Sequence, residues 1–281
     1  MIFPENIGEH LSIDEVSLSH GELYTFVTNK NGRCKKRTLV ACIKGTKSEI
    51  IVKILQKLPL ESRNKVKEIT LDMARNMESA VKEAFPNASL VTDRFHVVKL
   101  AIDALQHIRV KLRWKELDKE NRKIAKAKSK KVKYKPKVFS NGDTPKQLLA
   151  RSKFILNKKP FEWTGSQKLR AKILFDNFPV LQKAYEHIID FRAIYDTKFK
   201  NIAKIEFDKW INKTLEFKNN EFNSVCYSVE YHMENILNFF DNRNTNANAE
   251  SFNSKIKLFR ANLRGVTDTT FFLFRLHKLF A

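Results

Sequence analysis

The chain has 281 residues, 42% of them hydrophobic, and carries 53 Lys and Arg against 31 Asp and Glu, a formal net charge of +22. This composition can bury a sizeable core and excludes disorder throughout, and no segment approaches the roughly 18 uninterrupted apolar residues of a membrane span. So large an excess of positive charge favours a polyanionic partner, above all nucleic acid, because each phosphate contact releases counterions and adds affinity that does not depend on sequence.

The first part of the chain begins with three extended segments. β-Branched and aromatic residues predict strands at 11–18, 22–29 and 37–45, and together they form a plausible meander. Ser48 can cap a helix whose apolar residues recur at helical spacing until Pro59 ends it. Strands followed by an amphipathic helix indicate a folded α/β unit.

Strands and helices alternate in the next fifty residues. A short strand ends at Asp72, and a fifth strand covers residues 89–93. A helix lies between them, and the helix after the fifth strand is predicted to bury one face, which comprises Phe95, Val98, Ile102 and Leu105. The order βββαβαβα matches the RNase H-like fold, an α/β class with a mixed β-sheet. In that fold the first and fourth strands are neighbours, so acidic residues on them lie side by side.

The middle of the chain turns helical and basic. We predict three regions: residues 1–110 form the first part of the core, residues 111–244 form a large, basic, mainly helical insertion, and residues 245–281 complete the core as a C-terminal helix and a tail. Residues 109–137 contain fourteen Lys and Arg against three acidic residues. This tract predicts contacts with a nucleic-acid backbone through Lys126, Lys128, Lys130, Lys131 and Lys133. A solvated, partly disordered basic loop is the alternative interpretation.

The last predicted helix begins near residue 246 and is strongly two-sided. Its apolar stripe comprises Phe252, Ile256, Phe259 and Leu263. The opposite face carries Glu250, Asn253, Ser254 and Lys257. An apolar stripe of this kind anchors a helix to a core, which places Glu250 on a polar face held in a fixed position.

Three acidic residues fall at positions that could share one site. Asp14 lies on the first strand, Asp72 ends the fourth, and Glu250 lies on the late helix. Hard cations such as Mg²⁺ take oxygen ligands, and two such ions can activate an attacking oxygen and stabilise a leaving one. Taken singly, an acid at a strand end is more often a turn or cap residue. Only the combination of all three, on a chain this basic, favours phosphodiester chemistry.

Two strings in the chain carry a family resemblance. They are LDMARNMESAVKEAFPNASLVTDRFHVVKLAIDALQHIR at 71–109 and NANAESFNSKIKLFRANLRGVTDTTFFLFRLHKLFA at 246–281. They resemble bacterial insertion-sequence transposases of the DDE class, in the ISAon-like branch of a group distantly similar to Mutator-type elements. The resemblance covers both ends of an RNase H-like catalytic core and implies metal-dependent cleavage of DNA at the ends of an insertion sequence, followed by strand transfer into a target.

The resemblance also implies roles for single residues. Asp14, Asp72 and Glu250 match the catalytic metal ligands of the family, which use two Mg²⁺ ions that Mn²⁺ can replace. Asp93 and His96 match a D-x-x-H signature and are predicted to lie next to the active site. Asp93 follows a strand much as Asp72 does, so it stays open as the alternative second ligand. Many relatives have Gly after the glutamate, where this chain has Ser251, a difference that the branch shares.

The expected partners follow from the same resemblance. Double-stranded DNA at the transposon ends and the target would contact a basic surface beside the catalytic helix, formed by Asn253, Lys257, Arg260 and Arg264. We expect a homodimer or a larger assembly on DNA, in the bacterial cytoplasm and nucleoid. Because the chain begins almost at the first catalytic strand, we also expect either a separate protein that recognises the element's ends or a truncated chain.

Three functions remain open from the sequence. The first is a DDE transposase. The second is an RNase H-like nuclease that only hydrolyses DNA, and the third is a non-catalytic nucleic-acid-binding relic. All three explain the charge, but only the first accounts for both family strings.

Overall fold

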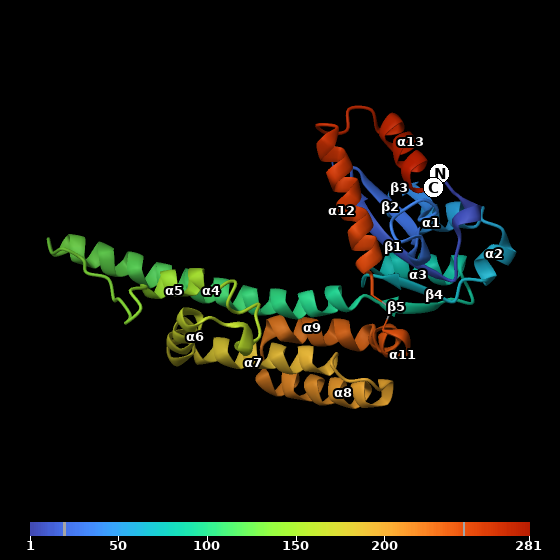
Figure 1. The fold of residues 1–281 in the computed structure, drawn as a ribbon. Coiled ribbons are helices and arrows are strands. Elements are labelled where there is room, and N and C mark those ends of the chain that lie inside the picture. Colours follow the sequence, from blue (N-terminus) through green and yellow to red (C-terminus); the bar gives the residue numbers. More distant parts are fainter. Residues whose placement is uncertain (19–20, 244) are drawn as a thin grey trace. The chain divides into compact units, whose positions relative to one another are not determined.

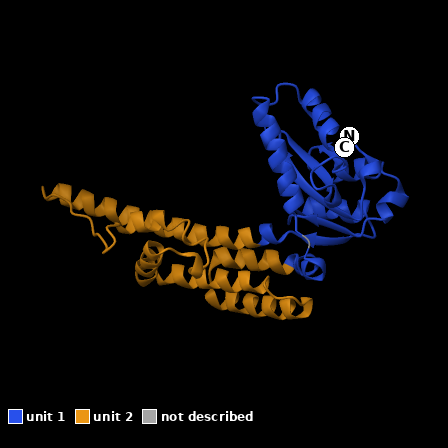
Figure 2. Cartoon of the chain, viewed as in Figure 1, with its two compact units in different colours: residues 1–97, 231–281 blue, residues 98–230 orange. Residues whose placement is uncertain are grey.

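The computed structural model describes residues 1–18, 21–243 and 245–281, and the chain forms two compact units. Residues 1–97 and 231–281 form one, the core unit, and residues 98–230 form the other, the helical unit (Figure 2). The sequence placed these boundaries at 110/111 and 244/245. The first of those positions lies inside a continuous helix, where periodicity gives no sign of a boundary, and Asn244 lies outside the described residues.

A five-stranded mixed sheet forms the centre of the core unit (Figure 1). Its strands are β1 His10–Ser17, β2 Leu23–Asn29, β3 Leu39–Lys44, β4 Glu68–Leu71 and β5 Ser89–Thr92, in the order β3-β2-β1-β4-β5. β2 is antiparallel to both β1 and β3, whereas β4 is parallel to both β1 and β5. The predicted RNase H-like α/β class is confirmed, including the pairing of the first and fourth strands.

Helices cover both faces of this sheet. On one face, α1 Ser48–Leu55 and α3 Arg75–Ala84 bury residues such as Leu55 and Met77 against Leu11 and Ile13 of β1. On the other face, α12 Ala247–Asn262 and α13 Thr269–Phe280 join a second apolar cluster with Val16. Successive side chains of a strand point to opposite faces. Asp14 therefore lies on the same face as Val16, beneath α12.

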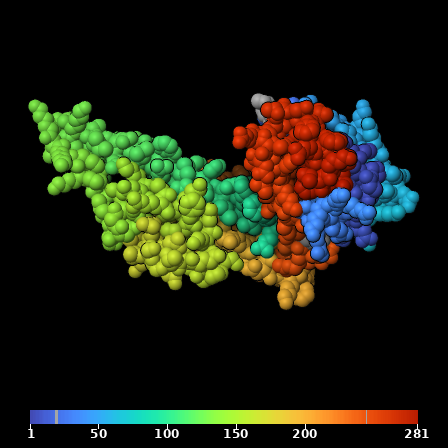
Figure 3. All heavy atoms as spheres, turned by 45° about the horizontal axis from the view of Figure 1, so that its top comes forward, coloured from blue at the N-terminus to red at the C-terminus, as the bar shows by residue number. Residues whose placement is uncertain are grey.

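Several core-unit elements were not predicted. They are η1 Pro4–Asn6, η2 Lys30–Gly32 and the short helices α2 Leu60–Asn64, α10 Met233–Leu237 and α11 Phe239–Asn242. α13 occupies the segment that the sequence described only as a tail, and it buries Phe272, Leu276 and Phe280 against the sheet. In the space-filling view, the last two helices (red) cover much of the visible face of this unit (Figure 3).

The helical unit contains most of α4 Arg94–Ser129, then α5 Pro145–Arg151, η3 Pro160–Glu162, α6 Gly165–Asn177, α7 Pro179–Ile194, α8 Lys200–Phe217 and most of α9 Asn220–Tyr231. Its centre is aromatic. His187 stacks on Trp210 at 4.7 Å between ring centroids, and Phe191 lies 4.5 Å from the same Trp210 ring. The predicted helical character of this region is confirmed.

The buried face of α4 differs from the one predicted. Its buried apolar residues are Val97, Ala101, Ala104, Leu105 and Ile108, so Leu105 is the one member of the predicted face that is fully buried, while Val98 and Ile102 are partly buried. Phe95 is 56% exposed, so its assignment to the buried face was wrong. Two stripes of this helix satisfy the apolar spacing and share Leu105, and the structure buries the one that contains Ala101 and Ala104. Among the described residues, no helix is long and apolar enough to cross a membrane.

Candidate active site

Three elements distant in sequence carry the three predicted acids. Asp14 lies within β1, Asp72 directly follows β4, and Glu250 lies in the first turn of α12. Phe252 holds α12 on the sheet, since it is fully buried and its ring lies 5.8 Å from that of Phe26. The half-buried Asp14 is therefore flanked by the end of a parallel neighbouring strand and by an anchored helix.

Asp14 accepts two hydrogen bonds. Its Oδ1 accepts from the backbone N–H of Glu15 at 2.8 Å, and its Oδ2 accepts from Nδ2 of Asn253 at 2.6 Å. Burial raises the pKa of Asp14 above its ordinary value, and the charge of Asp72 raises it further, while both hydrogen bonds and His96 act in the opposite direction. Asp14 is thus close enough to Asp72 for their charges to repel.

Glu250 interacts with the same group of residues. Burial raises the pKa of Glu250, and the charges of Asp93 and Asp14 raise it further, whereas His96 lowers it. Asp14 therefore interacts electrostatically with both Asp72 and Glu250. Asp93 and His96 act on the pKa of Glu250, and His96 and Asp72 act on that of Asp14, so each of the five residues predicted at or beside the active site interacts with at least one of the others.

Asp93 connects the end of β5 to the beginning of α12. Its side chain is 2% exposed, and Oδ1 accepts a hydrogen bond from the backbone N–H of Asn246 at 3.3 Å. A carboxylate at the beginning of a helix also interacts favourably with the helix dipole. Oδ2 lies 3.8 Å from Nε2 of His96 and has no hydrogen-bond partner within the described residues. Asp93 thereby fixes the end of α12 that carries Glu250.

Asp72 begins a turn. Its Oδ1 accepts from the backbone N–H of Ala74, the residue before α3, at 2.8 Å. A fourth acid, Glu15, interacts with Asp72 and was not predicted. Burial raises the pKa of Glu15, and the charges of Asp72 and Asp14 raise it further. Glu15 stands next to Asp14 in the chain, and that adjacency was the only available signal.

A buried cation lies on the same face of the sheet and was also missed. Nζ of Lys30 is 3.0 Å from Oε1 of Glu68 and donates a hydrogen bond to Oγ1 of Thr70. Burial lowers the pKa of Lys30, and the charges of Glu68 and Asp93 act against this shift. Nothing in the sequence marks a lysine at the end of β2 as buried.

The three acids supply the type of ligand that a hard divalent cation prefers, but they are not arranged to hold one. Asp14, Asp72 and Glu250 offer only carboxylate oxygens, which Mg²⁺ and Mn²⁺ prefer. Burial, and after it neighbouring carboxylates, raise the pKa of Asp14 and Glu250, and a bound cation would offset both effects. Within the described part of the chain, however, no three His, Cys, Asp or Glu side chains are grouped so that they could hold a metal ion. The acids are neighbours but do not form a preassembled cage.

The predicted DNA-binding residues fall into two sets. On α12 and just after it, Lys257, Arg260 and Arg264 are exposed, whereas the amide of Asn253 is hydrogen-bonded to Asp14. In the helical unit, the lysines of the last turns of α4 and the segment after it are all exposed: Lys126, Lys128, Lys130, Lys131 and Lys133.

A family comparison covers nearly the whole chain. The family model for DDE transposases of the ISL3 type, described as transposase, matches residues 11–276. No curated protein and no solved structure matches the chain significantly. The matched residues extend from β1 to α13 and include Asp14, Asp72 and Glu250.

Proposed function

Because the chain belongs to the ISL3-type DDE transposase family, we propose that it is the catalytic protein of an insertion sequence, cleaving DNA at the element's ends and joining those ends to a target. The family match confirms the predicted insertion-sequence transposase. The narrower assignment to the ISAon-like branch stays a prediction.

One observation carries the proposed chemistry. Asp14, Asp72 and Glu250 come from three separate elements, yet Asn253 of α12, the helix that carries Glu250, donates a hydrogen bond to Asp14 at 2.6 Å. Burial raises the pKa of Asp14 and of Glu250, and the charge of Asp72 on Asp14 and of Asp14 on Glu250 raises them further. Like charges gathered in a partly buried place cost free energy, and such an arrangement is typical of functional sites. This cost supports a catalytic role over a purely structural one.

Each residue has a proposed task. Asp14, Asp72 and Glu250 would hold Mg²⁺, or Mn²⁺ in its place, and bound divalent cations would activate the attacking oxygen and stabilise the leaving one. Asn253 fixes the orientation of the Asp14 carboxylate through its 2.6 Å hydrogen bond. Asp93 would position Glu250 through its hydrogen bond from the backbone N–H of Asn246, the residue before α12, and His96 lies 3.8 Å from the other oxygen of Asp93.

The basic surfaces would hold the DNA. Lys257, Arg260 and Arg264 continue along and beyond the helix that carries Glu250, so they are placed to contact the backbone near the reacting phosphate. The exposed lysines of residues 126–133 would contact a longer stretch. Such contacts position DNA without reading its sequence. We therefore propose that a separate protein recognises the element's ends. We also propose that the chain acts as a dimer or a larger assembly on DNA.

A strand-transfer assay tests this proposal. Labelled DNA that ends in the element's own terminus, already cut to expose its 3′-hydroxyl, is mixed with plasmid target, the full chain, the candidate end-recognition protein, and Mg²⁺, Mn²⁺ or chelator. We expect joined products only with a metal, and none from Asp14→Asn at equal DNA occupancy. Hydrolysis without joining would favour the nuclease. Absence of both activities, with DNA binding intact, would favour the relic.

A further inference from the structure

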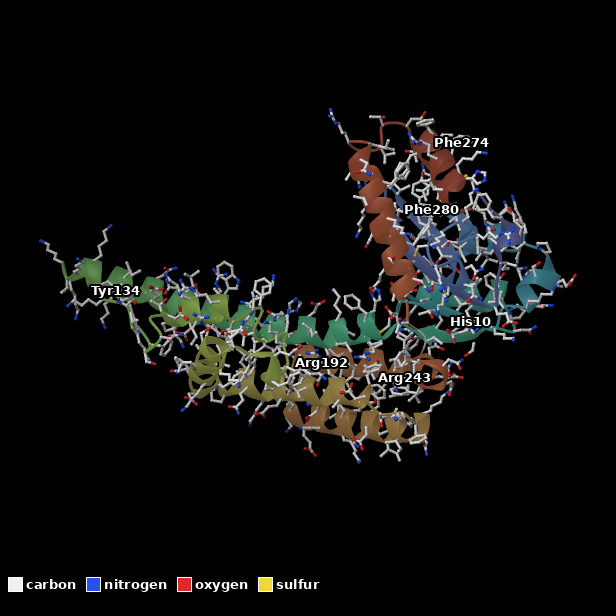
Figure 4. All side chains as sticks on the ribbon, viewed as in Figure 1. His10, Tyr134, Arg192, Arg243, Phe274 and Phe280 are labelled. Atoms are coloured by element: carbon white, nitrogen blue, oxygen red, sulfur yellow. The ribbon has the colours of Figure 1, made fainter. Side chains whose placement is uncertain are left out.

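Lys30 begins η2, directly after β2, and it is buried although it carries a charge. Its Nζ lies 3.0 Å from Oε1 of Glu68 and donates a hydrogen bond to Oγ1 of Thr70. Glu68 and Thr70 are two residues apart on β4, so they point to the same face of the sheet, and Asp72 is the next residue in that alternation. Glu68 is paired in register with His10 of β1, which Figure 4 labels. The side chain of Lys30 is therefore bonded to the strand that leads to Asp72.

The backbone of the same residue is bonded to α12. The carbonyl oxygen of Lys30 accepts a hydrogen bond from Nδ2 of Asn248 at 3.1 Å. Asn248 lies in the first turn of α12, two residues before Glu250. Lys30 thus joins two elements that are far apart in the sequence: its side chain holds the strand before Asp72, and its carbonyl oxygen holds the helix that carries Glu250.

Two further hydrogen bonds hold the β2–β3 loop, residues 30–38, on α12. Sγ of Cys34 donates to the carbonyl oxygen of Asn248 at 3.1 Å, and Nζ of Lys255 donates to the carbonyl oxygen of Cys34 at 2.7 Å. Arg33 and Cys34 have φ angles of 48° and 56°, a conformation that is uncommon for residues other than glycine. Such a conformation persists where surrounding contacts fix it. The loop is therefore a firm link between Lys30 and the first half of α12.

Stability alone does not explain a buried ion pair in this place. Both charges lose their hydration on burial, and apolar side chains of similar volume are often as stabilising or more so. Hydrogen bonds to an ammonium also fix where it lies relative to its acceptors, which apolar contacts do less strictly. Burial lowers the pKa of Lys30, while the charges of Glu68 and then Asp93 raise it, so Lys30 also interacts with the acid that holds the residue before α12. This arrangement favours a role in fixing geometry.

We propose that Lys30 is a positioning residue that fixes α12 relative to β4 and thereby sets the separation of the Glu250 and Asp72 carboxylates. The inference rests on the proposed function of these two acids and adds a residue that touches neither the DNA nor the reacting atoms. Lys30 acts through its ion pair and hydrogen bond on β4 and through Asn248 on α12.

A distance between two spin labels tests the link without any chemistry. The native cysteines Cys34, Cys42 and Cys226 are buried, so nitroxide labels can be directed to introduced, exposed cysteines. Ser79→Cys places one label on α3, which follows β4, and Leu258→Cys places the other on α12; both positions are exposed. Pulsed electron paramagnetic resonance of the full chain then gives the distribution of distances between α3 and α12.

The test variant is Lys30→Met/Glu68→Gln, which removes both charges and so leaves no buried charge without a partner. We expect it to broaden the distribution of distances. Lys44→Met/Glu22→Gln is the matched control, because it makes the same change in an exposed ion pair, and it should leave the distribution as in wild type.

Single-turnover cleavage at saturating DNA and Mg²⁺ measures the consequence for catalysis. Because a displacement of about 1 Å can lower a rate by about 100-fold, we expect Lys30→Met/Glu68→Gln to cleave about 10–100-fold more slowly than wild type with unchanged DNA affinity. Adding Asn248→Ala should slow cleavage no further, since both changes break the same link. Leu55→Ala, which removes core contacts on the opposite face of the sheet, should cleave at the wild-type rate below its melting temperature, and this separates positioning from stability.

Wild-type distances in Lys30→Met/Glu68→Gln would overturn the inference, whether or not the rate falls. If that variant does not fold, Asn248→Ala alone takes its place, because it leaves the ion pair intact, and wild-type distances in Asn248→Ala would then overturn the inference.

The two proposals can fail separately. If the wild-type chain neither cleaves nor joins DNA with any metal or partner while the distances still depend on Lys30, the proposed chemistry is wrong and the link between α12 and β4 stands. If cleavage and joining proceed in wild type, and neither distances nor rates respond to the loss of Lys30, the transposase function stands and the positioning role is wrong.

Discussion

Replacing Phe252 by Ala tests whether α12 is fixed firmly enough to position Glu250. The Phe252 ring is fully buried and lies 5.8 Å from that of Phe26 and 5.0 Å from that of Phe280. Truncation of a buried Phe to Ala costs about 3–5 kcal/mol, including the cavity that it leaves. Each aromatic pair contributes about 0.5–1.5 kcal/mol of this loss. We therefore expect Phe252→Ala to destabilise the core unit by about 3–5 kcal/mol.

Hydrogen exchange measures this loss where it occurs. Amides of β1 and β2 report on the core unit, whereas Trp114, Trp163 and Trp210 all lie in the helical unit, so their fluorescence reports on that unit instead. Because about 1.4 kcal/mol corresponds to a tenfold change, exchange of the strand amides should accelerate by roughly two to four orders of magnitude.

Leu258→Ala on the same helix is the matched control. Leu258 is 61% exposed, so its truncation should change stability by less than about 0.5 kcal/mol. If Phe252→Ala does not fold, Phe252→Leu takes its place. Because leucine keeps an apolar side chain, this variant should lose less stability than the loss of about 3–5 kcal/mol expected for Phe252→Ala. If Phe252→Ala and Leu258→Ala exchange at the same rate, α12 does not pack on the sheet and the placement of Glu250 beside Asp14 loses its support.

Three further predictions concern charge. Lys30→Met should lower the free energy of unfolding of the core unit in urea by about 3–5 kcal/mol, because it breaks the buried ion pair with Glu68. Lys44→Met, which breaks an exposed ion pair, should cost less than about 1 kcal/mol. Equal losses in the two variants would contradict the argument from burial. Burial raises the pKa of Asp14 in the folded chain, so the folded state binds the carboxyl proton more tightly than the unfolded state does. The free energy of unfolding therefore falls as pH rises from the ordinary pKa of an aspartate through the raised pKa of Asp14. Asp14→Asn should therefore melt higher than wild type at neutral pH and lose that advantage in acid; a variant that melts no higher at pH near 7 would refute this reasoning. Burial lowers the pKa of His187 from 6.5 to about 4, so the helical unit should lose stability as pH falls through that interval. Tryptophan fluorescence melts should show a smaller acid loss in His187→Gln, and an equal loss would exclude this histidine as the cause.

The sheet was predictable because its strands are rich in β-branched and aromatic residues. Each predicted strand is present, and the pairing of β1 with β4 followed from their order in the chain. Periodicity was less informative where two helical faces compete. In α4 the large Phe95 is exposed and the small Ala101 is buried, which apolar spacing alone does not distinguish.

The candidate site was predictable only in part. Asp72 and Glu250 lie in the family strings and the same resemblance matched Asp14; in the structure Asp14 interacts electrostatically with both, and their role as metal ligands stays a proposal. The supporting contacts depend on tertiary distances that a linear sequence does not contain. Asn253 was predicted to bind DNA, yet its amide donates to Asp14, and Lys30 is buried beside Glu68 although a lysine at a strand end is usually solvated.

Cleavage of a labelled element end in single-turnover conditions tests the central claim most directly. Wild type is compared with Asp14→Asn, Asp72→Asn, Asp93→Asn and Glu250→Gln at equal DNA occupancy, with Mg²⁺. The account predicts that cleavage disappears in the Asp14, Asp72 and Glu250 variants and is reduced but measurable in Asp93→Asn, which disturbs only the support of α12. Cleavage that survives in Asp72→Asn and disappears in Asp93→Asn would contradict the proposed set of ligands.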